Sequence, residues 1–177
     1  MLSYSDLFDY FKSERSRIIE ALEKLPADEL TKNRELSFYN IKDVLLHTIN
    51  NEDTLLHFRL QGIQPPDFRF SDYKDIEAVK SYIAEVDRKT SELLARMDEG
   101  ELKREVRVKR RDGSENVFTV EDALYQVPFE SIHHYGEIFA EFWRMDVDAP
   151  YLSFMNYARG KRAAAAATTA SPIRAGS

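Results

Sequence analysis

Residues 119–145 read TVEDALYQVPFESIHHYGEIFAEFWRM and carry most of the information about the fold. Thr119 and Asp122 have the spacing of a capping box, in which each side chain bonds to the backbone of the other residue at the start of a helix. Apolar residues then recur at helical spacing as far as Met145. We therefore predict a long helix that begins at Thr119 or the next residue, with a kink or a lost backbone hydrogen bond near Pro128, which lacks a backbone N–H.

The apolar residues of this predicted helix form two groups on roughly opposite sides. The first group consists of Leu124, Val127, Ile138, Phe142 and Met145, and the second of Phe129, Ile132, Phe139 and Trp143. A helix that is apolar on two sides is expected to be buried on both. The aromatic second side would also suit the interface of a homodimer.

A polar stripe lies between the two apolar groups and consists of Glu130, His133, His134, Glu137 and Glu141. Burying carboxylates and imidazoles costs free energy unless they pair or bind a cation. Glu130 and His134 are four residues apart, so they lie one above the other on the same face of a helix. Together they could bind one metal ion, whereas Glu137 and Glu141 are expected to be solvated or ion-paired.

A third ligand must come from another helix, and the two histidines outside residues 119–145 are His47 and His57. His57 lies near the end of its predicted helix and is expected to be peripheral. His47 lies at the edge of the apolar face and is the better candidate. A site of His47, Glu130 and His134 would suit zinc, nickel or iron(II) and leave coordination positions open, as catalytic sites do.

Three further helices are predicted from apolar residues at steps of three and four. The first spans residues 4–25 and ends before Pro26. Arg15 fills a position where an apolar residue is expected, so we predict a snorkelling or ion-paired side chain at the edge of the bundle. The second begins near Asn40, a good N-cap, and reaches about Gln61. The third opens near Asp75 and follows a loop at residues 62–74. The apolar positions are Tyr4, Phe8, Phe11, Ile18, Leu22 and Leu25; Ile41, Val44, Leu45, Ile49, Leu55 and Leu56; and Ile76, Val79, Ile83, Val86, Leu93 and Met97.

Residues 105–120 show the alternation of a β-strand instead of helical spacing. Asp112-Gly113 is a typical two-residue hairpin turn. Such a turn would place Val108 opposite Val117, so we predict a short β-hairpin with this register, which also places residue 106 opposite residue 119.

The predicted elements define an all-α fold: an up-and-down four-helix bundle with a short β-hairpin before the fourth helix and a short C-terminal helix. That last helix covers residues 151–157 and is expected to pack across the bundle. Residues 1–158 would form one domain. Residues 159–177 include five consecutive alanines and are interpreted as a disordered low-complexity tail or an artificial extension.

Composition and charge exclude several classes of protein. The 177 residues are 43% hydrophobic, with 11 Phe and 9 Tyr, which is enough for a core. The absence of cysteine excludes disulfides, thiolate zinc sites and a cysteine nucleophile. A net charge of −6 argues against a nucleic-acid partner. With neither a signal-peptide pattern nor a run of about 18 apolar residues, we expect no membrane partner and a cytoplasmic location.

Two motifs give the sequence a family resemblance. Residues 43–52, DVLLHTINNE, resemble the second-helix motif of the DinB-like superfamily, in which an acid commonly follows a metal-binding histidine by five residues. Residues 130–138, ESIHHYGEI, resemble the family's fourth-helix motif, His-x-x-His-His-Arg-Gly-Gln-Ile, whose first and last histidines bind the metal. The resemblance covers roughly residues 4–157 and implies the bundle, the hairpin and the ligands His47, Glu130 and His134.

The sequence departs from the family pattern at three positions: Glu130 replaces histidine, Tyr135 replaces arginine and Glu137 replaces glutamine. The family includes metal-dependent transferases that attach low-molecular-weight thiols to electrophiles. The resemblance thus implies a divalent-metal-dependent transferase with a thiol cosubstrate, or a hydrolase, acting on a small-molecule substrate. Glu52, His133 and Glu137 are the candidates for a nearby catalytic base.

Other interpretations remain open at this point. Glu130 and His133 form Glu-x-x-His, the motif of di-iron carboxylate bundles, but those proteins need the motif on two helices. A non-catalytic stress-response or binding module on the same bundle is the second alternative. Glu130 or Glu52 could also simply pair with Arg15, and both site histidines could be structural hydrogen-bonding groups.

Overall fold

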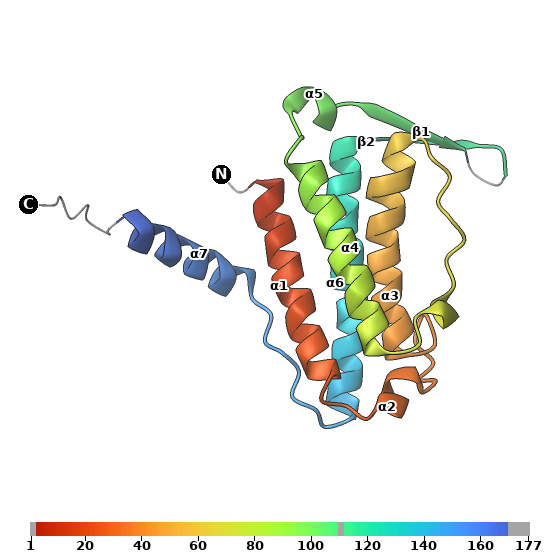
Figure 1. Cartoon of the computed structure of the whole chain (residues 1–177), viewed down its shortest axis with the longest axis vertical. Coiled ribbons are helices and arrows are strands. Elements are labelled where there is room, and N and C mark those ends of the chain that lie inside the picture. The colour runs from red at the N-terminus through yellow and green to blue at the C-terminus, as the bar shows by residue number, and fades with distance from the viewer. Residues whose placement is uncertain (1–2, 110–111, 170–177) are drawn as a thin grey trace, which may run out of the picture.

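The computed structural model describes residues 3–109 and 112–169 (Figure 1). Its elements are α1 (Tyr4–Leu22), α2 (Ala27–Thr31), α3 (Ile41–Glu52), the π-helix η1 (Asp53–Phe58), the 3-10 helices η2 (Arg59–Gln61) and η3 (Phe70–Asp72), α4 (Ile76–Leu94), α5 (Glu99–Leu102), β1 (Glu105–Lys109), β2 (Glu115–Thr119), α6 (Val120–Arg144) and α7 (Phe154–Thr169). The predicted all-α bundle, with a hairpin before its last long helix, is confirmed.

Side-chain caps fix where the long helices begin. The side chain of Asn40 accepts a hydrogen bond from the backbone N–H of Asp43 at the start of α3. Thr119 and Asp122 form the predicted capping box of α6, which continues through Pro128 to Arg144. Because such caps satisfy backbone N–H groups that have no partner within the helix, they set the first residue of each helix.

Helices α1, α3, α4 and α6 form the bundle, and the long connection between α3 and α4 sets their directions (Figure 1). This connection, at residues 62–75, returns the chain to the end of the bundle at which α3 began, so α3 and α4 run parallel. The bundle thus departs at this one step from the predicted up-and-down order, in which consecutive helices are antiparallel. Helices α3 and α6 run antiparallel side by side. Residues near the middle of α3 lie opposite residues near the middle of α6. This antiparallel pair holds the candidate site.

The helical segment that begins at Ile41 changes its winding before it ends. It is α-helical to Glu52, becomes a π-helix at Asp53–Phe58 and finishes as the 3-10 turn Arg59–Gln61. Gly62 then adopts a positive φ of 69°, which a residue without a Cβ does readily. The sequence predicted one uninterrupted helix here. A π-helix has more residues per turn than an α-helix, but this one is too short to be read from the apolar pattern.

The β-hairpin is present, but its predicted register is wrong by one residue. Val106 pairs with Phe118 and Val108 with Asn116, whereas the sequence predicted Val117 opposite Val108 and residue 119 opposite residue 106. The last pair, Lys109 and Glu115, encloses a five-residue connection instead of the predicted two-residue turn. Residues 110–111 of this connection lie outside the described residues. In the observed register Val106 is buried against the bundle. Burial of this apolar side chain favours the observed register over the predicted one.

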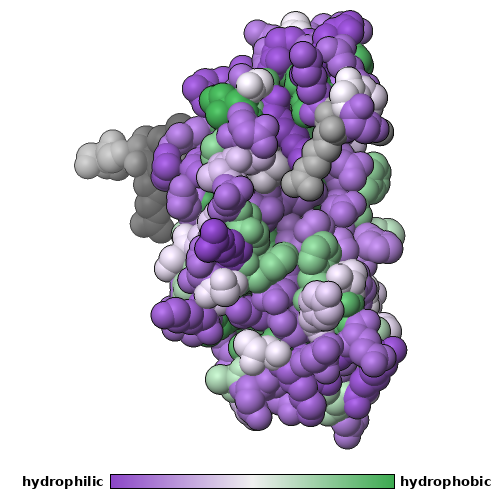
Figure 2. Space-filling view, turned by 90° about the vertical axis from the view of Figure 1, so that its right-hand side faces the viewer, coloured by the Kyte–Doolittle hydropathy of each residue, from purple (hydrophilic) through white to green (hydrophobic). Residues whose placement is uncertain are grey.

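The core consists of two adjoining apolar clusters. The larger is formed mainly by the four bundle helices, and its fully buried members include Ile18, Leu45, Val86 and Ile138. The smaller lies under the hairpin and includes Phe8, Leu56, Val106 and Leu124. The molecular face shown in Figure 2 is mostly hydrophilic, with hydrophobic residues only in scattered patches. Burial of this apolar surface is the main free-energy term that favours the fold.

Arg15 lies inside the bundle, paired with acids from two other helices. Its guanidinium forms ion pairs with Glu52 of α3, at 3.0 Å, and with Asp87 of α4. Thr90 donates a hydrogen bond of 2.6 Å to Glu52. The sequence placed Arg15 at the edge of the bundle as a snorkelling or paired residue; the pairing is observed, but the position is interior because both acids are there to satisfy the charge.

The outer face of α6 differs from the expectation of burial on both sides. Phe129, Ile132 and Trp143 are exposed, Trp143 by 72%, whereas Phe139 packs partly against the core. The bundle leaves one side of each helix facing outward, so a single chain cannot cover this second apolar group.

Helix α7 lies outside the bundle and projects away from it (Figure 1). Its first turns contact α1, where the Phe154 and Tyr10 rings are 5.1 Å apart. The sequence predicted a short segment packed across the bundle and a disordered tail from residue 159, whereas the helix continues to Thr169. Alanine is the strongest helix former, which accounts for the helix through the alanine run. Residues 170–177 lie outside the described residues.

Within the described residues, no helix is both long and apolar enough to cross a membrane.

Candidate metal centre

Three predicted ligands, His47, Glu130 and His134, come together where α3 faces α6. His47 Nε2 lies 3.4 Å from Glu130 Oε1, and His134 Nε2 lies 3.3 Å from the same oxygen. One donor atom from each of the three residues lies within 4.8 Å of the other two. Two imidazole nitrogens and one carboxylate oxygen thus surround a single point, as the ligands of one metal ion do.

Helix geometry accounts for this convergence. Glu130 and His134 are one turn apart on α6, so their side chains project from the same face. His47 reaches them from the neighbouring antiparallel helix. The three side chains differ in exposure, with His134 at 6%, His47 at 23% and Glu130 at 32%. The cluster is therefore buried on the His134 side and open to solvent on the Glu130 side, which leaves access for a small molecule.

Glu137 orients the ring of His134. Its Oε1 lies 2.7 Å from His134 Nδ1, and Ser37 donates hydrogen bonds to the same carboxylate from its backbone N–H at 3.1 Å and its hydroxyl at 2.9 Å. When Nδ1–H donates to Glu137, Nε2 is left without a proton and faces Glu130. Metal-binding histidines are commonly held by a carboxylate in this way, which fixes the tautomer.

Electrostatics favours a charged Glu137 and a neutral His47. Burial raises the pKa of Glu137, but the hydrogen bonds from Ser37 and His134 outweigh it, so the pKa lies below its ordinary value. Burial lowers the pKa of His47, and this effect outweighs the attraction of Glu130. A neutral imidazole has a lone pair on one nitrogen, which is the form that binds metal.

The loop before α3 and one turn of α6 complete the surroundings of the cluster. Phe38 stacks on His47, with ring centroids 3.9 Å apart and planes at 18°. Gln126 donates a hydrogen bond of 3.3 Å to Glu130 Oε2, the oxygen that does not face the histidines. Sequence reasoning missed Ser37 and Phe38, because they lie on a loop with no periodic pattern. Gln126 could have been found, since it precedes Glu130 by one helical turn.

The three candidates for a catalytic base lie in different places. Glu137 is beside His134, as described above. The His133 ring is exposed, with its centroid 5.1 Å from that of His134, and His133, His134 and Glu137 form a second group that could hold a metal ion. Glu52 is instead engaged in the interior by Arg15 and Thr90. This ion pair is the structural alternative that the sequence left open for Glu52, and it leaves Arg15 unavailable to Glu130.

His57 and Glu141 lie outside both metal-binding groups. His57 Nε2 lies 3.1 Å from the hydroxyl of Thr90, and burial lowers the pKa of this histidine. His57 was expected to be peripheral, but it is half-buried against α4. Glu141 is buried and ion-paired with Arg34, at 3.1 Å, and with Arg144. The sequence predicted that Glu141 is either solvated or ion-paired, and the structure shows it ion-paired.

The structure thus defines a helical bundle with a histidine and carboxylate cluster between two antiparallel helices. The profile of the DinB superfamily matches residues 10–138, so the chain belongs to this superfamily, whose members often bind divalent metals. The comparison with curated proteins finds no matching relative.

Tyr135, one of the three departures from the family pattern, has its side chain away from the cluster of His47, Glu130 and His134. It stands where arginine is common in the superfamily, yet its side chain is buried in the core. Burial raises the pKa of its hydroxyl to about 12, with Arg15 acting in the opposite direction. The Tyr135 hydroxyl therefore stays protonated at neutral pH, in the interior where the charge of Arg15 acts on it.

Proposed function

We propose that the protein is a divalent-metal-dependent enzyme whose metal is held by His47, Glu130 and His134. The supporting observation is that one nitrogen or oxygen from each of these side chains lies within 4.8 Å of the other two. Two imidazoles and a carboxylate suit zinc, nickel or iron(II), and three protein ligands leave positions open for a substrate. The reaction that we propose is transfer of a low-molecular-weight thiol to a small electrophilic substrate, with hydrolysis as the related alternative.

The bound metal would supply Lewis acidity that lowers the pKa of a thiol or water in an open position. The chain has no cysteine, so a thiol nucleophile must enter as a cosubstrate. Glu130 adds a negative charge where the superfamily usually has a neutral histidine. The donor set therefore carries one charge, which favours a harder metal than three imidazoles would.

Glu137 is the side chain best placed to move a proton beside the ligands. It accepts the Nδ1–H of His134 and two hydrogen bonds from Ser37, and it is about a fifth exposed. His133 is the second candidate, because it lies beside His134 on the solvent side. We assign Glu52 no part in catalysis, because Arg15 and Thr90 occupy its carboxylate in the interior.

Elemental analysis of purified protein tests the proposal. We expect one metal ion per chain in the wild type and less than a tenth of that in His47→Ala and His134→Ala, with helical circular dichroism unchanged. Glu130→Ala should retain metal with at least tenfold weaker affinity. His57→Ala is the matched control, because this histidine belongs to neither metal-binding group, and it should keep full metal content.

The same analysis distinguishes the alternatives. A wild-type chain that stays metal-free after incubation with zinc, nickel and iron would favour a non-catalytic binding or stress-response module on this bundle. Two irons per chain would favour a di-iron protein. Against the latter, the two metal-binding groups found among the described residues share His134 and do not include a second Glu-x-x-His.

We also propose a homodimer through the outer face of α6. Tyr125, Phe129, Ile132 and Trp143 are exposed, and with Gly136 they follow one another along a single stripe of the helix. Gly136 lies near the middle of the stripe, and a Cβ built there meets nothing within 4 Å. Apolar residues at steps of three and four form the seam of paired helices, and a small central residue lets two such helices approach closely. A second copy of α6 is therefore the partner that we expect.

A further inference from the structure

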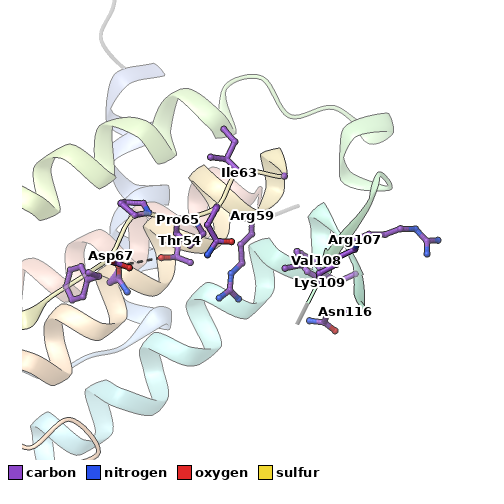
Figure 3. A pocket seen from close by; sticks show the side chains of 15 residues that line it. Thr54, Arg59, Ile63, Pro65, Asp67, Arg107, Val108, Lys109 and Asn116 are labelled. Atoms are coloured by element: carbon purple, nitrogen blue, oxygen red, sulfur yellow. Dashed lines mark hydrogen bonds between the residues drawn. The ribbon is translucent and has the colours of Figure 1, made fainter. Parts of the chain in front are cut away.

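A cavity of about 910 Å³ opens where the end of the α3–η2 segment meets the following loop and the hairpin (Figure 3). One wall is the end of the α3–η2 segment, where Asn50, Thr54 and Arg59 line it. The loop at residues 62–68 forms a second wall, and the hairpin forms the third. The cavity thus lies among three segments that are far apart in the sequence.

The lining of the cavity is basic, although the chain is acidic. Arg59, Arg107 and Lys109 line it, against the single acid Asp67. The whole chain has 25 Lys and Arg against 31 Asp and Glu, so cations are concentrated here against the overall balance. A concave site lined by one sign of charge attracts ligands of the opposite sign. The charge of the lining therefore favours an anionic ligand.

Two of these three cations are available to a ligand. Arg107 pairs with Glu105 at 3.2 Å and with Glu115 at 3.6 Å, and its guanidinium points away from the other labelled residues (Figure 3). Arg59 lies between Thr54 and the hairpin. Within residues 3–109 and 112–169, neither Arg59 nor Lys109 has an acidic partner within ion-pair distance. Their charges are free to bind an anion.

A neutral hydrogen-bond donor lies between the cavity and the metal centre. Thr54 donates a hydrogen bond of 3.5 Å to Asn50 Oδ1, so the amide NH₂ of Asn50 remains free to donate. Asn50 follows His47 by three residues in the α-helical part of α3, which places the two side chains on one face about 4.5 Å apart along the axis. The cavity therefore begins about one helical turn from the metal centre.

We propose that this cavity binds the anionic group, a carboxylate or a phosphate, of a substrate whose other end reaches the metal centre. Arg59 and Lys109 would hold the anion, Asn50 would donate to the ligand between them and the metal, and the aromatic walls Phe68 and Phe118 would contact its carbon chain. This inference rests on the proposed function, because it identifies the substrate class of the same metal site. Guanidinium and ammonium groups form strong charge-assisted hydrogen bonds with both anions.

The first test uses metal-free protein and two small anions, inorganic phosphate and succinate, titrated while backbone amide NMR shifts are followed. We expect saturable shifts at Asn50 and Lys109 for at least one anion. The anion that binds more tightly shows whether the anionic group of the substrate is a phosphate or a carboxylate. The double variant Arg59→Gln/Lys109→Gln should bind that anion at least tenfold more weakly. Arg107→Gln is the matched control and should change the affinity less than twofold. Equal binding by the double variant and the wild type would overturn the proposal.

The second test uses zinc-loaded protein and two thiols of equal length, the anionic 8-mercaptooctanoate and the neutral 8-mercapto-1-octanol. Calorimetry should show at least tenfold tighter binding of 8-mercaptooctanoate, and the double variant should remove this preference without changing zinc content. Equal affinities of the wild type for the two thiols would overturn the anion site while leaving the metal site intact. Anion binding that depends on Arg59 and Lys109 in a chain that never binds metal would support the cavity and overturn the proposed metalloenzyme.

Discussion

Arg15 and Glu52 form an ion pair inside the bundle, with 3.0 Å between Nη1 and Oε2 and each side chain only 4% exposed. Removing one member of a buried pair leaves the other charge unpaired in a medium of low dielectric constant, which typically costs about 3–5 kcal/mol. We therefore expect Arg15→Ala to lower the free energy of unfolding by about that amount. Urea denaturation followed by circular dichroism measures it.

The double variant Arg15→Met/Glu52→Leu is the control for this pair. It removes both charges of this pair and refills the space with apolar atoms, so it should recover part of the stability lost in Arg15→Ala. The recovery is expected to be partial because Asp87, which is about a quarter exposed, still lacks its Arg15 partner. A loss below about 1 kcal/mol in Arg15→Ala would mean that the pair is solvated and does not lie inside the bundle.

Glu137→Gln is expected to weaken metal binding without abolishing it. The glutamine keeps the size of the side chain but removes the charge that holds His134 Nδ1–H at 2.7 Å. Loss of such a supporting carboxylate typically costs 10–100-fold in metal affinity. Competition with a chromophoric chelator measures the change, and the exposed Glu99→Gln is the control. An unchanged affinity would show that Glu137 does not orient a metal ligand.

The capping box of α6 should make stability depend on pH. Hydrogen bonds from the backbone and hydroxyl of Thr119 hold the pKa of Asp122 below its ordinary value. A carboxyl with a lowered pKa stabilises the fold above its unfolded pKa, and this contribution disappears as the pH falls through the folded pKa. Asp122→Asn should therefore be less stable than the wild type at pH 7, with the difference shrinking toward pH 2. Urea unfolding at a series of pH values tests this, and a constant difference would contradict it.

Ile132→Glu should dissociate the proposed homodimer. The substitution places a charge at the middle of the exposed apolar stripe, and a second copy in the same position would face it with a like charge. Light scattering at micromolar concentrations should give a dimer for the wild type and a monomer for the variant. Arg88→Glu, on the exposed surface of α4, serves as the control. A wild-type chain that is monomeric at 100 micromolar would rule out this interface.

Local sequence signals predicted the helices well. The side chains of Asn40, Thr119 and Asp122 cap the helices that their spacing indicated. The one-residue error in the hairpin register arose because Asp112-Gly113 was read as a complete turn, whereas Gly113 has a φ of 85° within a five-residue connection. The parallel direction of α3 and α4 depends on the path of a long loop, which has no periodic signal.

The cluster of His47, Glu130 and His134 could be predicted because its members lie on helices, where spacing determines the face. The roles of Ser37 and Phe38 could not, because their loop positions follow from tertiary packing. Glu52 shows the opposite case: it follows His47 by five residues, as an acid commonly does in the family motif, yet its carboxylate is bound by Arg15. Sequence spacing predicts on which face of a helix a residue lies, but it does not predict which partner its side chain binds.

The walls of the cavity and the ligands of the metal centre come from different kinds of segment. The ligands lie on α3 and α6, while the loop at residues 62–68 and the hairpin form two of the three walls. Loops accept insertions and substitutions more readily than packed helices. Under the proposed function, substitutions in the loop and the hairpin would therefore change the substrate that is bound, while the candidate metal ligands on the helices stay the same. Directed evolution for altered substrate choice should accordingly begin with libraries at residues 63–67 and 107–109.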